Sequence, residues 1–325
     1  GQRSVAGSRL LVKAGETVSP NTVPDQRRRI ATDISVVIPT VGRQMLRQCL
    51  GSIAAGQLLP HSIVVVDQSS NEAIRGWLDT LAELGVEARY QPSSQTGRAA
   101  GVNRGVESVT SEYVAITDDD CQVAPDWLLN LRKHLETNPG AVITGRVESG
   151  GEETVGIVVT SMEEVHYRRP RLKFDSLCGG NMATSRSVFR RVGLLDEDAA
   201  LACSEDGEWA YRALRNGVSI VYVPDAIITH HGWRNRDKRV EQYRAYALSH
   251  GAFYGKYLRR ADWFIALRAV VHYLRALRRL LKGILSGSVE EVRIARAYLV
   301  WLIPGAIKGF RSRAGLITGR SGNAC

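Results

Sequence analysis

The chain has 325 residues, of which 44% are hydrophobic and 23% charged, values that are ordinary for a globular protein with one large domain or two smaller ones. Its five cysteines are scattered and form no CxxC pair, which argues against a disulfide framework or a thiolate zinc site and favours a reducing compartment. The net charge of +10 arises in residues 240–325, where 15 Lys and Arg stand against 4 Asp and Glu, and it predicts an anionic partner for this segment.

The first two thirds of the chain alternate between predicted strands and helices. Residues 1–32 are small, polar and basic, and predict a poorly ordered leader without a signal peptide. Short apolar runs rich in β-branched residues then predict strands at 34–38, 63–66, 86–90 and 113–117. Apolar positions at helical spacing predict the intervening helices at 46–53, 73–84 and 97–109. This alternation predicts the α/β class, with a mostly parallel sheet flanked by helices.

Polar residues follow three of the predicted strands, namely Thr40, Asp67 and Asp118–Asp120. Ligands of parallel sheets bind beyond the carboxyl ends of the strands, so these residues predict one shared site. Three consecutive carboxylates repel one another unless a cation neutralises them, and their hard oxygens suit Mg²⁺ or Mn²⁺ shared with phosphate. A solvated acidic turn before Pro125 is the alternative interpretation.

A second acidic segment, Ser204-Glu205-Asp206, opens a predicted amphipathic helix that ends near Gly217. Ser204 is a suitable helix cap, and acidic residues in a first turn are favoured by the helix dipole. A carboxylate at such a place also serves as a general base on a hydroxyl when it lies in a cleft. Both interpretations stay open on the residues alone.

Two further segments carry candidate chemistry. His230-His231 follows a short predicted strand, where an imidazole either packs or completes a metal site. Gly179-Gly180 permits a tight turn or the close approach of a ligand. The sequence contains neither a GxxxxGK[ST] loop, a GxGxxG fingerprint nor a GxSxG elbow, which removes the main signals of P-loop, dinucleotide-binding and serine-hydrolase enzymes.

Taken in order, these segments resemble the family-2 glycosyltransferases, which adopt the GT-A fold. The resemblance covers roughly residues 33–235. The matching segments are Val36–Thr40, Val65–Asp67, Arg98–Gly105, Thr117–Asp120, Cys178–Asn181, Glu205-Asp206 and His230-His231. The family departs from this chain after Asp67, where it often has a second acidic residue and Gly-Ser instead of Gln68-Ser69-Ser70, and before Asn103, where it often has Arg instead of Val102.

The resemblance implies a nucleotide-sugar pocket and a metal site. The implied donor-binding residues are Pro39, Thr40, Arg43, Asp67, Arg98, Asn103, Asp118 and Asp119. Among these, Asp67 would hydrogen-bond a pyrimidine base, Asn103 would close the pocket, and Arg98 would supply the charge missing at Val102. Asp120 would hold Mn²⁺ or Mg²⁺, with His231 preferred over His230 as a further ligand.

The resemblance also implies how the reaction runs. Asp206 would be the catalytic base of an inverting transfer and Glu205 its neighbour. Gly179, Gly180 and Asn181 would lie on the acceptor side. The expected function is transfer of a hexosyl or deoxyhexosyl group from a nucleoside diphosphate sugar, with UDP and dTDP favoured, in cell-surface glycan or glycolipid assembly. A catalytically silent membrane-associated scaffold is the alternative, and a sugar nucleotidyltransferase a weaker one.

Residues 240–325 are predicted to form a basic helical extension of a catalytic domain that spans residues 33–239. Between 263 and 285 two stripes appear at helical spacing. The basic one comprises Arg268, His272, Arg275, Arg279 and Lys282, and the apolar one Leu267, Val270, Leu274, Leu277, Leu281 and Leu285. A basic amphipathic helix is typical of peripheral binding to an anionic membrane surface, here the cytoplasmic face, and no nucleic acid motif accompanies it. The alternative is a helix that packs its apolar stripe on the catalytic domain.

Overall fold

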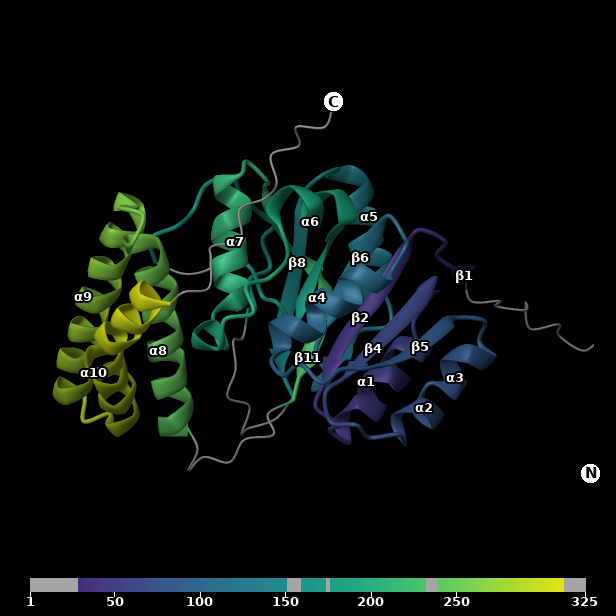
Figure 1. Cartoon of the computed structure of the whole chain (residues 1–325), viewed down its shortest axis with the longest axis horizontal. Helices are drawn as coiled ribbons and strands as arrows, with labels where there is room; N and C mark the ends of the chain where they lie inside the picture. The colour runs from purple at the N-terminus through teal and green to yellow at the C-terminus, as the bar shows by residue number, and fades with distance from the viewer. Residues whose placement is uncertain (1–28, 151–158, 174–175, 232–238, 313–325) are drawn as a thin grey trace, which may run out of the picture.

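The computed structural model describes residues 29–150, 159–173, 176–231 and 239–312. A central sheet carries helices on both faces, and three long helices lie together beside it (Figure 1). Of the predicted leader, residues 1–28 lie outside the described residues. Arg29–Ile30 forms a short strand, β1, that pairs with β3 (Leu58–Leu59), and Ala31 is buried.

In the described part of the chain, nine strands form the sheet in the order β5-β4-β2-β6-β10-β8-β11-β7, with β9 paired to β11. Their bounds are β2 Ile34–Thr40, β4 Ser62–Asp67, β5 Glu87–Pro92, β6 Tyr113–Thr117, β7 Cys121–Val123, β8 Val142–Ser149, β9 Val165–Tyr167, β10 Asn181–Ser185 and β11 Ile220–His230. Strands β2, β4, β5, β6, β8 and β11 run in one direction, and β7, β9 and β10 run in the other. The predicted mostly parallel α/β sheet is therefore confirmed.

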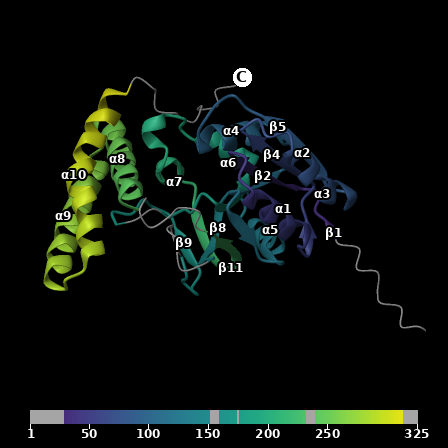
Figure 2. The ribbon, with the colours of Figure 1, turned by 90° about the horizontal axis from the view of Figure 1, so that it is seen from below.

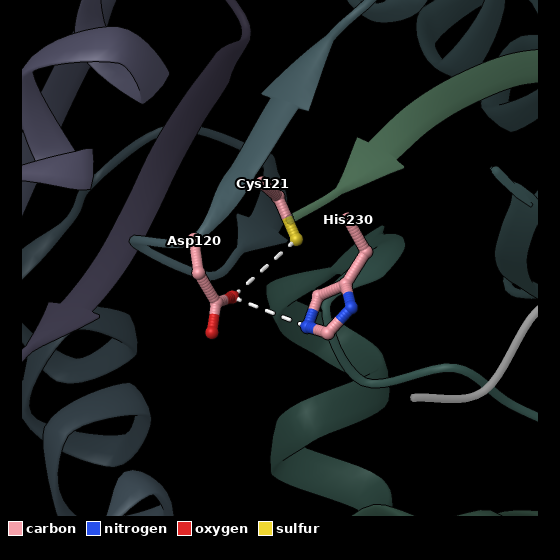
Figure 3. A group of neighbouring side chains, drawn as sticks. All are labelled: Asp120, Cys121 and His230. Carbon is pink, nitrogen blue, oxygen red and sulfur yellow. Dashed lines mark hydrogen bonds and ion pairs between the residues drawn. The ribbon is translucent and has the colours of Figure 1, made fainter. Parts of the chain in front are cut away.

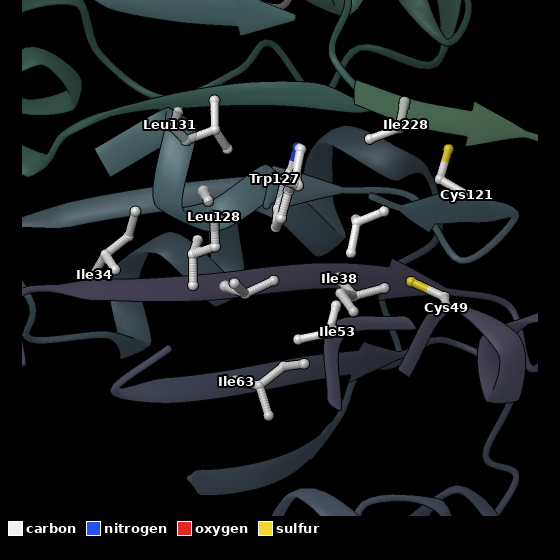
Figure 4. Packing of buried hydrophobic residues seen from close by; sticks show 14 of the residues in the cluster. Ile34, Ile38, Cys49, Ile53, Ile63, Cys121, Trp127, Leu128, Leu131 and Ile228 are labelled. Carbon is white, nitrogen blue, oxygen red and sulfur yellow. The ribbon is translucent and has the colours of Figure 1, made fainter. Parts of the chain in front are cut away.

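The sheet separates two hydrophobic cores, and the helices of the sheet region cover them. These helices are α1 Met45–Ala54, α2 Ile74–Trp77, α3 Asp79–Glu83, α4 Arg98–Ser108, α5 Trp127–Thr137, α6 Arg186–Val192 and α7 Glu205–Arg215, with a 3₁₀ turn at Ala199–Leu201. Val36 and Ile38 of β2 pack into the core that includes α1 and α5 (Figure 4), whereas Val37 packs into the core that includes α4. Alternation along a buried strand thus covers both faces of the sheet. The helix predicted at 73–84 is divided into α2 and α3, two residues after Gly76, a poor helix former.

The C-terminal helices α8 (Arg239–Leu258), α9 (Trp263–Leu285) and α10 (Val289–Arg311) form one group beside the sheet region (Figure 2). Helices α8 and α10 are in backbone contact through four glycines. A Cβ atom at Gly251, Gly255, Gly305 or Gly309 would lie 1.9–2.2 Å from a backbone oxygen of the other helix. None of the described helices combines the length and apolar character needed to cross a bilayer.

Helix α8 is anchored to the sheet region by buried polar contacts. Lys256 Nζ lies 2.5 Å from Asp196 Oδ2 and 3.1 Å from Asp198 Oδ2. Tyr257 donates a hydrogen bond to Glu208 Oε1 at 2.6 Å. The predicted boundary at residues 239/240 therefore separates two segments that share a buried interface.

Helix α9 turns its basic stripe inward and its apolar stripe outward. All five basic-stripe residues line a cavity between α9 and the sheet region. The exposed fractions of the six apolar-stripe residues range from 42% for Leu277 to 88% for Leu285. The alternative in which the apolar stripe packs on the catalytic domain is thus wrong, because the side facing that domain is the charged one.

Candidate active site

A cavity of about 330 Å³ opens at the carboxyl ends of β2 and β6. Its walls come from the turn after β2, the acidic run after β6, the start of α4, the segment before α7, the end of β11 and helix α8. The lining residues are Pro39, Thr40, Val41, Arg43, Gln68, Gly97, Arg98, Asp118, Asp119, Asp120, Ala202, Cys203, His230, Gln242 and Tyr246. Six of the eight residues predicted to bind the donor therefore lie around one cavity, and Asp67 and Asn103 do not line it.

Asp119 is a buried residue of this lining, and we call the space the donor cavity after the predicted donor residues around it. Its buried carboxylate accepts a hydrogen bond from Thr40 Oγ1 at 2.6 Å and pairs with Arg43 Nη1. Burial raises the pKa of Asp119, although the Thr40 hydrogen bond and the Arg43 charge oppose that rise. Asp119 thereby holds Thr40 and Arg43, two of the three residues at the end of β2 that the sequence assigned to the donor.

Asp120 faces the imidazole of His230 (Figure 3). Its Oδ1 lies 3.5 Å from His230 Nε2, and its Oδ2 lies 3.7 Å from Arg43 Nη1. Burial favours the neutral acid, but His230 and Arg43 outweigh it and lower the pKa of Asp120, so this carboxylate is ionised at neutral pH. The neighbouring Cys121 thiol lies 3.8 Å from the same Oδ1, and burial raises its pKa well above the ordinary value.

The donor set around Asp120 fits a divalent cation. Asp120, Cys121 and His230 offer atoms that lie within 4.8 Å of one another. A carboxylate oxygen and an imidazole nitrogen are ligands that Mn²⁺ accepts, and Mg²⁺ accepts the carboxylate, whereas a protonated thiol is a poor partner for either ion. Asp120 and His230 are therefore the residues that would hold the metal.

The structure corrects the preference for His231 as the metal ligand. His230 is the last residue of β11, and His231 lies beyond the end of the strand. The His231 ring packs on Gly150, where a Cβ atom would lie 2.4 Å from His231 Nδ1. Only the backbone N–H of His231 reaches Asp120, donating to its carbonyl oxygen at 2.9 Å.

Arg98 connects the donor cavity to the start of α7. Its Nε lies 2.7 Å from Asp118 Oδ1, and its Nη1 lies 3.5 Å from Glu205 Oε1. Burial disfavours this cation, but Asp118, Glu205 and Asp206 outweigh burial and raise the pKa of Arg98. A permanent positive charge therefore lies between the donor carboxylate and the two acidic residues of α7.

The turn formed by Gly179 and Gly180 brings the donor side and the predicted base together. Gly179 N–H donates to Asp206 Oδ2 at 3.1 Å, and a Cβ atom on Gly179 would lie 2.9 Å from Asp206 Cβ. A Cβ atom on Gly180 would lie 2.6 Å from Asp118 Oδ2. Only glycines allow both approaches. Ser204 does not cap α7 with its side chain, because its hydroxyl is hydrogen-bonded to Ser249 at 2.8 Å.

Glu205 differs from the other carboxylates in its protonation. Burial raises its pKa to about 8, and the negative charge of Asp206 adds to that rise, while Arg98 opposes it. Its Oε2 atom is buried without a hydrogen-bond partner among the described residues. Glu205 is consequently neutral at pH 7 despite its approach to Arg98.

Asp67 lies beneath the cavity. Its Oδ1 accepts hydrogen bonds from the N–H and hydroxyl of Ser69, and its Oδ2 accepts from Asn71 N–H and Tyr90 OH. Burial opposes ionisation, but these hydrogen bonds outweigh it and lower the pKa of Asp67. The side chain is fully buried, so the expected contact with a base is not open to it in this structure. Gln68 lines the cavity in place of Asp67. Its amide nitrogen donates to the Gly97 carbonyl oxygen, and its amide oxygen accepts from Gly97 N–H.

Asn103 and Asn181 also serve the fold. Asn103 holds the segment after α6, exchanging hydrogen bonds with the backbone of Leu195 and donating to Glu197. Asn181 donates to two backbone carbonyls and accepts from Trp127 Nε1 at 2.8 Å. Both side chains are buried with their polar atoms engaged, which corrects their assignment to the donor and acceptor sides.

Helix α8 supplies cavity residues that the sequence reading missed. Gln242 and Tyr246 lie one helical turn apart, and Gln242 Nε2 donates to Tyr246 OH at 3.0 Å. Their spacing of four residues placed them on one helix face, but nothing in the sequence showed that this face meets the sheet edge.

Comparison with solved structures defines the fold as that of GT-A glycosyltransferases. The mannosyltransferase PcManGT from Pyrobaculum calidifontis, solved with GDP-Man and Mn²⁺, has a TM-score of 0.57 and 18% identity over 86% of this chain and 88% of its own. TarS from S. aureus has a TM-score of 0.52 and 14% identity over 82% of this chain and 55% of its own.

The family model named Glycosyl transferase family 2 matches residues 35–193. The chain therefore carries a family-2 glycosyltransferase domain, as the order of its motifs predicted. The pre-mycofactocin glycosyltransferase of Mycobacterium tuberculosis is 26% identical over 207 residues, 61% of this chain and 42% of its own length. The glucosyl-dolichyl phosphate glucuronosyltransferase of Haloferax volcanii is 24% identical over 176 residues, 50% of this chain and 56% of its own. The chain thus spans about half the length of these relatives.

Proposed function

We propose that this chain is an inverting glycosyltransferase that moves a hexosyl or deoxyhexosyl group from a nucleoside diphosphate sugar to an acceptor hydroxyl. The observation that carries the proposal is the glycine turn. Gly179 contacts Asp206, and the next residue, Gly180, contacts Asp118 of the donor cavity. Structural neighbours solved with GDP-Man and with UDP support a nucleoside diphosphate donor. UDP- and dTDP-sugars are the donors we favour.

Asp206 is the proposed general base. It takes the proton of the acceptor hydroxyl while that oxygen attacks the anomeric carbon from the side opposite the leaving group, so that one displacement inverts the configuration. Gly179 N–H orients the carboxylate through Oδ2, and the start of α7 favours its negative charge. Glu205, being neutral, adds no second charge beside the base.

Negative charge develops on the leaving nucleoside diphosphate. Arg43 and Arg98 lie in the donor cavity, where fixed positive charges stabilise such a leaving group. A divalent ion bound by Asp120 and His230 would add electrostatic stabilisation of the diphosphate. Mn²⁺ and Mg²⁺ are the candidates.

Peripheral attachment to the cytoplasmic face of a membrane is part of the proposal. The outward sides of α9 and α10 expose large apolar side chains, among them Trp263, Leu274, Ile284, Ile303 and Phe310. An exposed apolar helix surface of this kind is typical of interfacial helices. It suits a glycan or lipid-linked acceptor in cell-surface glycan or glycolipid assembly.

The test is calorimetric titration of the protein and of two variants with UDP, dTDP and GDP, with Mn²⁺ or Mg²⁺ and again with chelator. We expect one diphosphate to bind in a metal-dependent way. Asp120→Ala should lose that binding, whereas Asp206→Asn should keep it and lose sugar transfer by roughly 100- to 10,000-fold, the usual contribution of a general base. Asp79→Asn, on the exposed side of α3, is the matched control.

Three results would contradict the proposal. Unchanged turnover in Asp206→Asn would exclude this residue as the base. Folded protein that binds none of the diphosphates would instead favour the catalytically silent scaffold, and pyrophosphate release from a nucleoside triphosphate would favour a nucleotidyltransferase.

A further inference from the structure

A second cavity, of about 700 Å³, lies between the sheet region and the C-terminal helices. Strands β8, β9 and β11 contribute one wall, and α8, α9 and α10 contribute the other. Among the described residues, its lining includes six cationic side chains and one carboxylate, Glu291. The six are Lys173, Arg268, Arg275, Arg278, Arg279 and Lys282, and we call this space the basic cavity.

In the described lining, one carboxylate pairs with one of these cations. Glu291 is engaged by Arg279, with hydrogen bonds of 2.7 and 2.9 Å. Arg268 is 4% exposed and its guanidinium lies 5.5 Å from the Phe253 ring centre and 5.7 Å from that of Tyr254, which fixes its position. Cations gathered around one concave space repel one another and attract an anion.

The basic cavity differs in charge from the donor cavity. The donor cavity contains three carboxylates, Asp118–Asp120, with Arg43 and Arg98, and therefore takes a diphosphate together with a metal cation. The basic cavity has the opposite balance, so it can bind a phosphate group directly, since several fixed cations supply charge-assisted hydrogen bonds.

The basic cavity reaches the proposed base. Cys178 belongs to its lining, and the next residue, Gly179, donates its N–H to Asp206 Oδ2. The end of the basic cavity that Cys178 lines is therefore one residue along the chain from the backbone group that contacts the proposed base.

We propose that the basic cavity binds the phosphate or diphosphate group of the acceptor and so directs the acceptor hydroxyl to Asp206. This inference rests on the proposed transferase function and names the chemical class of its acceptor. The phosphate belongs either to a soluble phosphorylated saccharide or to a lipid-linked one, for which the apolar outward side of α9 lies on the same helix.

The experiment measures binding of inorganic pyrophosphate by calorimetry at low salt with EDTA present, because the chelator removes metal-dependent binding in the donor cavity. We compare the full chain with Arg275→Gln/Lys282→Gln and with Arg293→Gln/Arg296→Gln. Both pairs are exposed enough to replace without disturbing the core, and both remove two charges, but only the first pair lines the basic cavity.

We expect pyrophosphate to bind the full chain and the Arg293/Arg296 variant alike, and the Arg275/Lys282 variant at least about tenfold more weakly, since two charge-assisted contacts are lost. Equal affinity in both variants, or no binding to the full chain, overturns the inference. UDP with Mn²⁺ is titrated into the same three proteins. Absence of UDP binding would contradict the proposed transferase function. The pyrophosphate comparison would still show whether the basic cavity binds phosphate.

Competition distinguishes the two sources of phosphate. Farnesyl diphosphate and glucose 1-phosphate are compared as competitors of bound pyrophosphate. If farnesyl diphosphate displaces pyrophosphate at a concentration at least about tenfold lower, the cavity is assigned to a lipid-linked acceptor. The reverse order assigns it to a soluble phosphorylated saccharide. Displacement by neither compound contradicts an acceptor site.

Discussion

Glu205 and Asp206 are neighbours in the chain with opposite electrostatic surroundings. Glu205 is buried beside Arg98, and its pKa is raised to about 8. Asp206 receives a backbone hydrogen bond on each oxygen, from Gly179 and Gly207. Hydrogen bonds from donors stabilise an ionised carboxylate, so these two contacts suit the role of general base that we propose for Asp206.

The protonation of Glu205 makes stability depend on pH. Between its ordinary value of 4.5 and about 8 the folded chain keeps the proton that the unfolded chain releases. The folded state then binds more protons, so the Glu205 contribution to the free energy of unfolding falls as pH rises through this interval. Glu205→Gln, which cannot ionise, should therefore gain stability relative to the natural chain between pH 5 and pH 8.5.

Urea unfolding at those two pH values measures this difference. Glu83→Gln, an exposed carboxylate of α3, is the control and should show no such gain. A stability difference between Glu205→Gln and the natural chain that stays the same at both pH values would show that Glu205 is ionised in the folded state.

At the scale of elements, the turn of Gly179 and Gly180 decides how near donor and base come. An alanine at position 180 would push on Asp118 Oδ2, which lies 2.6 Å from the added Cβ, and would strain its pair with Arg98. We expect Gly180→Ala to weaken nucleoside diphosphate binding at least about tenfold and to lower the free energy of unfolding by about 1–3 kcal/mol, as overpacking does.

Gly51→Ala is the control for this prediction, because no atom lies within 4 Å of an added Cβ in the middle of α1. It should bind nucleotide normally and be stabilised by about 0.5–1 kcal/mol. Nucleotide titration and thermal unfolding of both variants test the pair. If Gly180→Ala binds as tightly as Gly51→Ala, the turn does not position Asp118.

The elements predicted from the sequence are those with strong local patterns. Strand ends carrying Thr40 and Asp118–Asp120 could be recognised because a buried parallel strand is apolar and its end is polar. The sequence could not show which of His230 and His231 is the metal ligand, because this depends on where β11 ends and on the side to which its last side chain points. The roles of Asn103 and Asn181 were hidden as well, since their partners are backbone groups of distant segments.

At the scale of the whole molecule, the group of α8, α9 and α10 has two different sides. One side lines the basic cavity, and the other exposes the apolar stripe of α9. The sequence predicted both stripes from their helical spacing, but their orientation depends on the contacts of α8 with the catalytic domain. Those contacts join residues such as Lys256 and Asp196, which no local pattern connects.

The outward side predicts binding to vesicles that contain anionic lipid. Replacing Leu274 and Leu281, which are 56% and 55% exposed, by Glu should weaken binding by about tenfold per site, because each leucine loses about 1.5 kcal/mol of burial in the bilayer interface. Sedimentation with vesicles measures the effect.

Leu84→Glu/Leu129→Glu changes two exposed leucines of the sheet region and is the matched control. Equal vesicle binding by both double variants would show that α9 is not the membrane contact. Nucleotide affinity should be the same in all three proteins.

The glycine contact between α8 and α10 has a consequence for how the protein opens. Because α10 touches the backbone of α8, and α8 is fixed to the catalytic domain by buried Lys256, neither helix can loosen without breaking the shared interface. The helices and the catalytic domain then belong to one cooperative unit, and amide hydrogens in the middle of α8 exchange with solvent only when the whole unit unfolds.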